Sequence, residues 1–425
     1  MLPLLFGCAP DRPDIVLISL DTTRADVIDA RTTPNLWALA SRGVRFQWAL
    51  AHTPTTLSSH ASVWTGRDPH GHTIPRNGYA LPAGLPVLAE RMAQGGFDTI
   101  GIIGSSALSR PMGMDRGFRI WGEHFSGRRI HQFESLAEEV TDRALKQVER
   151  RKRGLPLFLF AHYFDAHGPY DAPEPWKRKW VDPAYAGFFD GSPEATQKLV
   201  LASREGTALP EDIEAARARY RGEVSYVDDQ VGRLLRRFDD PFIVVFADHG
   251  EVLGDTRERR WGHGSDVDLE ATHVPLIVAG PGIPPRGVDT PVAVSDIGAT
   301  VLGLAGIDGG LGQGRDLSAS WRGDTLPVRP IFLEATQPRN LERTDAWNNL
   351  DRERGVVRDA ILFIHCPAQG TGPDLIGLGR AATDLTIVPM MRELLHGWDA
   401  AAPPYRKDEM DDVTREGLKA LGYLE

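Results

Sequence analysis

The sequence predicts an α/β fold built on an open, mostly parallel sheet with helices on both faces. Two observations support this prediction. Apolar runs rich in β-branched residues, such as DIVLISL at 14–20 and FIVVF at 242–246, are typical of strands buried on both faces. Helical segments separate these runs along the chain, and strands that alternate with helices favour a parallel sheet.

The predicted elements follow one another in a regular order. The strands are short apolar runs at 14–20, 99–103, 156–163, 242–246 and 274–279. The helices are expected at 33–43, 61–65, 87–95, 130–151 and 210–237. In sheets of this kind, ligands bind beyond the carboxyl ends of the strands. We therefore look for the functional residues directly after each strand.

The alternation of strands and helices weakens after residue 325. A smaller C-terminal unit is expected there, with strands and closing helices at 329–334, 355–364, 390–398 and 413–421. The predicted organisation divides the chain into a leader or lipoprotein remnant, a main domain and a C-terminal unit, at 1–13, 14–325 and 326–425.

The composition is that of a globular protein without a strongly basic surface. Among 425 residues, 41% are hydrophobic and 25% are charged, and the formal net charge is −10. This charge argues against a nucleic-acid scaffold. A small anionic substrate remains compatible with it, because a metal site can outweigh the overall field. No apolar run of the sequence reaches the length of a transmembrane helix.

The chain has two cysteines, Cys8 and Cys366, which do not suggest a disulfide framework. Residues 5–8 read LFGC and resemble the lipobox of bacterial lipoproteins, in which the cysteine is lipidated after signal cleavage. This resemblance implies a protein of the bacterial cell envelope, periplasmic or lipid-anchored at Cys8. The alternative is an apolar tail without a targeting role.

Acidic and imidazole side chains follow two of the predicted strands. Asp21 comes directly after the first strand, and Asp248 and His249 follow the strand at 242–246. Carboxylate and imidazole groups are suitable ligands for a divalent cation. Because these residues share the same placement at strand ends, we expect them to form one metal site.

A second acidic and imidazole group consists of Asp165 and His167 in YFDAHGPY and His263 in WGHGSD. Glycines on both sides of His263 allow close approach of the backbone to a ligand. These three residues could bind a second metal ion. Alternatively, one or both histidines could bind an anionic substrate or protonate its leaving group. The remaining alternative is a structural role for the two loop histidines.

Residues 53–66, TPTTLSSHASVWTG, place a cluster of hydroxyl side chains at the start of a predicted helix. Backbone N–H groups and the helix dipole favour an anion there, so the cluster predicts a nucleophile, with an ordinary serine or threonine cap as the alternative. Thr56 is the candidate, and its hydroxyl needs a metal or a base to lower its pKa. His60 and Arg24 could neutralise the bound anion, although Arg24 could instead be structural.

Together these residues resemble the sulfatase family of the alkaline phosphatase superfamily. The segments that carry the resemblance are LISLDTTRAD, WTGRDPHGH, FDAHGPY, FADHGE, GHG…EATHVPLIVAGPG and SDIGATVLGLAGI, at 17–26, 64–72, 164–170, 246–251, 262–282 and 295–307. The resemblance implies an alkaline phosphatase-like α/β/α sandwich and a smaller C-terminal domain with a short antiparallel sheet. It also implies nucleophilic attack on the sulfur or phosphorus of an ester, hydrolysis of the covalent intermediate, and a metal held by Asp21, Asp248 and His249.

The chain departs from the sulfatase pattern at several positions. Sulfatases carry a cysteine or serine in a C/S-x-P-x-R pattern, and this residue is oxidised to formylglycine. In the same register this chain has Thr56, Ser58 and His60 at the nucleophile, proline and arginine positions. His263 replaces the family's lysine between two glycines, and Thr22 stands at the second of two aspartates that many members have.

A threonine nucleophile is instead similar to the nucleotide pyrophosphatase/phosphodiesterase branch of the superfamily, which uses two zinc ions. At one metal, the ligand types of that branch would be met by Asp21, Thr56, Asp248 and His249. At the other metal, they would be met by Asp165, His167 and His263.

The sequence therefore predicts an enzyme, a metal-dependent hydrolase of sulfuric or phosphoric esters, in which Thr56 attacks and His167 and His263 take part in catalysis. Phosphomonoester, phosphodiester or phosphonate chemistry is preferred to sulfate chemistry, because the formylglycine precursor is missing. The expected cofactor is one or two divalent ions (zinc, calcium or manganese), and the expected partner is a small anionic ester. Two alternatives remain open, a phosphoryl-headgroup transferase and a degenerate member that binds an anion or glycan without turnover.

Overall fold

A computed structural model describes residues 12–125, 133–256, 260–336, 352–366, 374–379, 381–382 and 384–403. Within these residues, an eight-stranded sheet in the order β12-β2-β11-β7-β1-β6-β4-β5 forms the centre of the molecule. Its strands, in sequence order, are β1 (Ile15–Leu20), β2 (Val44–Phe46), β4 (Asp98–Ile102), β5 (Ile120–Gly122), β6 (Leu157–Tyr163), β7 (Phe242–Ala247), β11 (Leu276–Ala279) and β12 (Arg286–Val288).

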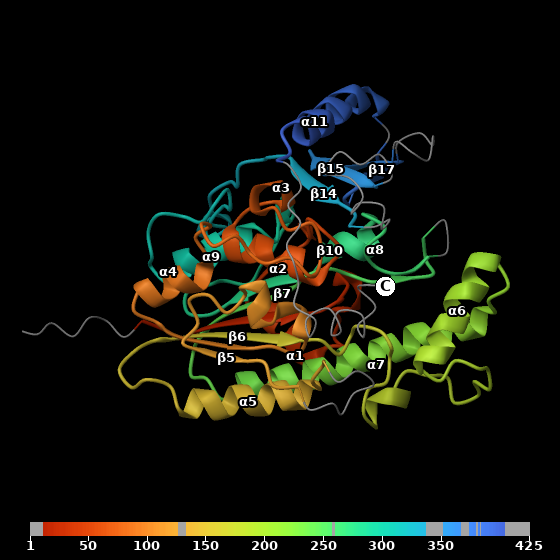
Figure 1. Ribbon diagram of the computed structural model, residues 1–425, viewed down its shortest axis with the longest axis horizontal. Helices are drawn as coiled ribbons and strands as arrows, with labels where there is room; N and C mark the ends of the chain where they lie inside the picture. Colours follow the sequence, from red (N-terminus) through yellow and green to blue (C-terminus); the bar gives the residue numbers. More distant parts are fainter. Residues whose placement is uncertain are drawn as a thin grey trace, which may run out of the picture.

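Helices cover both faces of this sheet (Figure 1). The helices on one face are α1 (Pro34–Arg42), α5 (Ala137–Glu149) and α7 (Pro210–Leu235). Those on the other are α2 (Thr56–Thr65), α4 (Leu88–Gln94) and α9 (Asp296–Leu304). The central strands β1, β6 and β7 are buried almost throughout, which is why they are continuous apolar runs. The predicted α/β fold with helices on both faces is confirmed.

Smaller elements complete the described part of the chain. The remaining helices are α3 (Pro69–His72), α6 (Pro193–Glu205), α8 (Leu269–Thr272), α10 (Ala319–Arg322) and α11 (Val388–Ala400). Single turns of 3₁₀ helix lie at Ala25–Val27, Ser106–Leu108, Arg110–Met112, Trp176–Arg178 and Leu385–Ile387. Two minor sheets pair β10 (His273–Val274), β3 (Ala49–Leu50) and β13 (Val292–Ala293), and β8 (Val252–Leu253) with β9 (Trp261–Gly262).

The strand predicted at 274–279 is divided into two. His273–Val274 belongs to β10 in a minor sheet, and β11 begins at Leu276 in the main sheet. Pro275 lies between them, and a proline has no N–H to donate to a strand neighbour. In addition, β11 runs antiparallel to both of its neighbours, β7 and β2. The sheet is therefore mostly, but not wholly, parallel.

The helix predicted at 130–151 begins later than expected, at Ala137. Residues 133–136 are not helical, and Glu134 forms an isolated bridge with Ser105 instead. Residues 130–132 of the predicted helix lie outside the described residues. The start at Ala137 has a cause in the tertiary structure, because the Asp165 carboxylate accepts its backbone N–H at 3.0 Å.

The C-terminal unit contains the expected short antiparallel sheet. Its strands are β14 (Ile331–Glu334), β15 (Arg354–Arg358), β16 (Ile361–His365) and β17 (Asp374–Gly377), and α11 packs on β15. Leu333 and Leu362 of this sheet share one hydrophobic cluster with Leu50 and Ala293 of the main body. The division at residue 325 stays a prediction, and this shared cluster packs the two predicted units together.

Two predictions concern the ends of the chain. The lipid anchor at Cys8 and the closing helix at 413–421 lie outside the described residues, as does most of the leader at 1–13. The envelope localisation and the anchor therefore stay predictions. Within the described residues, no helix combines the length and the apolar character needed to cross a bilayer.

Candidate active site

Neighbouring strands of the main sheet bring the first group of predicted ligands together. β1 and β7 pair in parallel with Leu20 opposite Ala247, so the residues that follow them, Asp21 and Asp248, lie side by side at one edge of the sheet. The backbone N–H of Asp21 donates to Tyr163 O at 2.8 Å, which fixes the end of β1 to the end of β6.

Asp21, Asp248 and His249 form a compact group of donor atoms within 4.8 Å of one another. His249 Nε2 lies 3.6 Å from Asp248 Oδ2 and 4.0 Å from Asp21 Oδ1. All three side chains are fully buried, and these three atoms have no hydrogen-bond partner among the described residues. Buried, unpartnered carboxylate and imidazole atoms that converge in this way fit a divalent cation.

Contacts around the group hold its members in place. His249 Nδ1 donates to Gly250 O at 2.9 Å, which leaves the lone pair on Nε2, the atom that faces the carboxylates. Asp248 Oδ1 accepts the backbone N–H of His249 at 2.8 Å and of Thr22 at 3.3 Å. These two hydrogen bonds orient Asp248 so that its other oxygen, Oδ2, faces His249 Nε2.

The electrostatics of the group also favour a cation. Burial raises the pKa of Asp21 to about 8. Burial, with the charge of Asp21 next, raises the pKa of Asp248 well above its usual value. Burial lowers the pKa of His249 far below its usual value, so its imidazole is neutral. Two carboxylates that are costly to ionise and a neutral imidazole would be stabilised by a positive ion between them.

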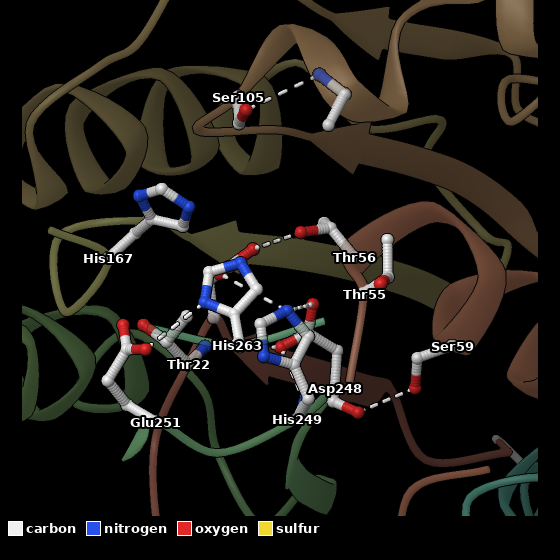
Figure 2. Close-up of polar contacts among 12 residues, drawn as sticks. Thr22, Thr55, Thr56, Ser59, Ser105, His167, Asp248, His249, Glu251 and His263 are labelled. Atoms are coloured by element: carbon white, nitrogen blue, oxygen red, sulfur yellow. Dashed lines mark hydrogen bonds and ion pairs between the residues drawn. The ribbon is translucent and has the colours of Figure 1, made fainter. Parts of the chain in front are cut away.

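Thr56 lies at the first position of α2, beside this group (Figure 2). Its Oγ1 donates to Asp21 Oδ2 at 3.3 Å, and its side chain is fully buried. Ser59, one turn along the helix, donates from Oγ to Asp248 O at 2.6 Å. These two contacts attach the start of α2 to the ends of β1 and β7. The predicted nucleophile is therefore placed where the helix N-terminus meets the candidate metal site.

Two loop histidines, His263 and His167, lie close to His249 of the candidate metal site. The His263 ring lies 4.4 Å from that of His249 and 5.0 Å from that of His167 (Figure 2). His263 Nδ1 donates to Glu251 Oε1 at 3.2 Å. Burial alone would lower the pKa of His263, but the Glu251 carboxylate holds that pKa above its usual value. A cationic imidazole at this point can bind an anion or donate a proton.

Asp165 is not placed as a metal ligand. Its Oδ1 accepts the backbone N–H of Ala137 at the start of α5, and among the described residues it belongs to none of the compact groups of donor atoms. The Asp165 carboxylate accepts a hydrogen bond that would otherwise be missing at the N-terminus of α5. The sequence did not reveal this contact. Among the described residues, Asp165 does not share a compact donor group with His167 and His263, so the expected second metal site stays a prediction.

His60 does not face the substrate side of the site, contrary to expectation. Its Nδ1 donates to Thr56 O at 2.7 Å, and its Nε2 accepts from Ser19 Oγ at 2.8 Å, so the ring lies between α2 and β1 and is fully buried. Both ring nitrogens are thereby used. Although His60, His162 and Asp248 also form a compact group of donor atoms, this bonding leaves His60 no lone pair for a metal.

Arg24 is held in ion pairs rather than turned to the site. Its guanidinium contacts Asp26 and Asp255 at 2.6 Å each and donates to Glu251 O at 3.3 Å. The predicted substrate-binding role of Arg24 is corrected by this arrangement. The structural alternative explains it, because the side chain joins the segment after β1 to the segment after β7.

His162 and Glu251 are site residues that sequence reasoning missed. His162 lies on β6 opposite Ser19 of β1, and its Nε2 donates to Asp21 Oδ2 at 3.1 Å. Gly104 N donates to its Nδ1 at 3.4 Å, which fixes this tautomer. The available signals were a histidine within the apolar run PLFLFAHY and the last residue of FADHGE.

Thr22 occupies an unusual backbone conformation next to the site. Its φ is +48°, a region that β-branched residues rarely adopt. Tyr220 Oη donates to Thr22 O at 2.8 Å and holds the segment there. Within the described residues, the buried Oγ1 of Thr22 has no hydrogen-bond partner. Strain of this kind is typical of functional sites.

Comparison with known proteins gives a consistent family. The protein-family model described as Sulfatase matches residues 13–307 of this chain. Choline-sulfatase of Rhizobium meliloti is 24% identical over 356 residues, which is 70% of this chain and 68% of that protein. Iduronate 2-sulfatase of Homo sapiens is 32% identical over 171 residues, 34% of this chain and 30% of that protein. The solved phosphonate monoester hydrolase of Silicibacter pomeroyi shares the fold, with a TM-score of 0.68 at 21% identity over 91% of this chain and 94% of its own.

Proposed function

Since this chain belongs to the sulfatase family and is a hydrolase acting on ester bonds, we propose that it cleaves a phosphate or phosphonate ester with Thr56 as nucleophile and a divalent cation as cofactor. One observation carries the proposal. The Thr56 hydroxyl, at the N-terminus of α2, donates to Asp21 Oδ2 beside three buried donor atoms that lack hydrogen-bond partners among the described residues.

Asp21, Asp248 and His249 would hold the cation. A bound cation supplies positive charge that lowers the pKa of the Thr56 hydroxyl and polarises the ester oxygens. Two carboxylates and one imidazole favour zinc or manganese over calcium, which prefers an all-oxygen shell. We propose one ion at this group, because Asp165 is used by the N-terminus of α5.

The residues of the chain would carry the reaction in two steps. In the first, the Thr56 oxygen bonds to phosphorus, its proton passes to Asp21 Oδ2, and the bond from phosphorus to the leaving oxygen breaks. The leaving oxygen takes a proton from His263 or His167. In the second step, water attacks phosphorus and gives a proton to the histidine that protonated the leaving oxygen, the bond from phosphorus to Thr56 breaks, and the Thr56 oxygen takes back its proton from Asp21 Oδ2.

One feature supports phosphorus over sulfur as the reacting centre, and a second shows how the anion could be held. Threonine is not a precursor of formylglycine, so the nucleophile of sulfatases cannot be made here. His263, whose pKa is raised by its contact with Glu251, would supply the positive charge that the family's lysine gives elsewhere. The likeness in fold to a phosphonate monoester hydrolase is compatible with this choice.

The test compares four aryl esters on purified protein: p-nitrophenyl phosphate, bis(p-nitrophenyl) phosphate, p-nitrophenyl phenylphosphonate and p-nitrophenyl sulfate. We expect turnover of a phosphorus ester and a loss of about 10³-fold or more in Thr56→Ala. Thr65→Ala is the matched control, because Thr65 lies in the same helix and its hydroxyl bonds only to Ala61 O among the described residues.

Full activity in Thr56→Ala would refute the mechanism. Turnover of the sulfate ester alone would refute the preference for phosphorus. Transfer of the phosphoryl group to an added alcohol in place of water would indicate a transferase, and tight binding without turnover would indicate a degenerate member.

A further inference from the structure

The C-terminal sheet reaches the candidate active site at the end of β14. Glu334 N donates to His52 O at 2.9 Å, and His52 Nδ1 donates to Phe332 O at 2.7 Å. β14 therefore lies along the segment that leads into α2. Two residues after β14 ends, Thr336 enters the site with its side chain buried.

Thr336 joins two segments that lie far apart in the sequence. Its backbone N–H donates to Gly264 O at 2.8 Å, and its hydroxyl donates to the same carbonyl at 3.3 Å. Thr336 Oγ1 also lies 2.5 Å from Thr55 Oγ1. Because the hydroxyl proton of Thr336 is used by Gly264, the Thr55 hydroxyl is the donor in the second contact.

The two joined segments carry the residues of the proposed reaction. Thr55 is the residue before Thr56, and Gly264 is the residue after His263. Thr55 also occupies the N-cap position of α2, where a threonine hydroxyl ordinarily accepts a helix N–H. Within the described residues it makes no such contact, and the hydroxyl goes to Thr336 instead.

We propose that Thr336 is a positioning residue, which sets the distance and orientation of Thr56 relative to His263. This inference rests on the proposed roles of those two residues. The C-terminal unit would then help to position the reacting groups, since one side chain just after β14 contacts both segments. Small displacements of reacting groups have large effects on rate, so the loss of this link should lower kcat more than it raises KM.

The test uses Thr336→Val, which keeps the shape and the backbone N–H but removes the hydroxyl, and Thr336→Ser, which keeps the hydroxyl. On bis(p-nitrophenyl) phosphate we expect Thr336→Val to lower kcat by about 10-fold or more with KM changed less than about 3-fold, and Thr336→Ser to stay within about 3-fold of the unmodified protein. Thr300→Val is the matched control, because Thr300 is a buried threonine of α9 outside the site.

Two further measurements make the test independent of turnover and of folding. Orthovanadate binding, measured by calorimetry, should weaken in Thr336→Val by the same factor as kcat/KM, because vanadate resembles the transferring phosphoryl group. Thr55→Val should resemble Thr336→Val, and the double variant should be no worse than either, since both remove one link. Thermal unfolding checks that each variant is folded.

The outcomes separate this inference from the proposed function. A folded Thr336→Val with unchanged kcat and unchanged vanadate binding, alongside an inactive Thr56→Ala, overturns the inference and leaves the proposed function standing. A Thr336→Ser variant as impaired as Thr336→Val also overturns it. An active Thr56→Ala overturns the proposed function, and the positioning role falls with it.

Discussion

His162 Nε2 donates to the same oxygen of Asp21, Oδ2, that accepts the hydroxyl of Thr56. The histidine is fully buried on β6, and its burial lowers its pKa to about 3, so it acts as a neutral donor. The hydrogen bond from His162 fixes Oδ2 of Asp21, and Oδ1 of Asp21 faces His249 Nε2. His162 would therefore orient Asp21 as a candidate metal ligand through this hydrogen bond.

Replacing His162 should weaken the metal site. We expect His162→Leu to lower the affinity for zinc or manganese by about 10-fold to 100-fold, because Asp21 loses the donor that orients it. The affinity is measured by competition with a chelator. His273→Gln is the control, since His273 contacts Gln47 O and Trp48 instead. Unchanged affinity in a folded His162→Leu protein would contradict this role.

The substitution Thr22→Asp should lower the unfolding temperature without metal and raise it with metal. In Thr22→Asp, a third buried carboxylate would lie beside Asp21 and Asp248, so the metal-free protein should unfold at a lower temperature. With manganese or zinc present, the added ligand should raise the unfolding temperature and tighten metal binding.

Thr22→Asn is the control for that substitution, because asparagine has a similar shape, tolerates a positive φ and carries no charge. It should show neither effect to the same extent. The prediction fails if Thr22→Asp and Thr22→Asn respond equally to metal.

The stability of the metal-free protein should fall as the pH rises. The pKa of Asp21 is about 8 in the folded protein, because the side chain is buried, against 3.8 for an ordinary aspartate such as that of the unfolded chain. Between these values the folded state keeps a proton that the unfolded chain has lost, so the free energy of unfolding decreases with rising pH and levels off above about pH 8. Urea unfolding in the presence of a chelator, at pH values from about 5 to about 8, measures this slope.

Two comparisons assign that slope to the candidate site. Saturating manganese should flatten it, because the cation replaces the proton as the partner of the carboxylates. Asp21→Asn should reduce it, since one of the two carboxyl groups with a raised pKa is gone and only Asp248 is left to titrate. An identical slope in chelator, manganese and Asp21→Asn would show that other groups cause it.

Asp165→Ala should reduce stability without loss of metal. Removal of the carboxylate leaves the buried N–H of Ala137 without its acceptor, at a cost of about 1–3 kcal/mol. The amount of bound metal, measured by elemental analysis, should equal that of the unmodified protein, whereas Asp248→Asn should lose it. Release of one equivalent of metal in Asp165→Ala would restore Asp165 as a ligand.

The sequence was sufficient for the residues that follow strands. Asp21, Asp248 and His249 come together because parallel neighbouring strands end at one edge, a relation that needs only the strand assignments. Thr56 was chosen differently, from a hydroxyl cluster at a predicted helix start and from its register against the sulfatase pattern. The position of a residue directly after a parallel strand can be predicted from the sequence, and it determines where that residue lies in the fold.

The failures have a different cause, which is competition from partners that are distant in the sequence. Asp165 accepts a backbone N–H at the N-terminus of α5. Arg24 forms an ion pair with Asp255, a residue 231 positions away. His60 lies one helical turn after Thr56, so its ring meets the Thr56 carbonyl rather than the substrate side. Thr336 carried no signal at all, because its contacts depend on the packing of β14.

The antiparallel direction of β11 has a consequence for how this site can change. Since β11 begins where β7 ends, the loop between them, residues 248–275, leaves and rejoins the sheet at one edge, and it is closed at its base by Gly250 N donating to Ala271 O at 2.8 Å. The same loop carries His249, Glu251 and His263, so its base fixes candidate site residues of which the last two lie 12 positions apart in the sequence. A change in the length of this loop would therefore alter the proposed metal site and the proposed proton donor together.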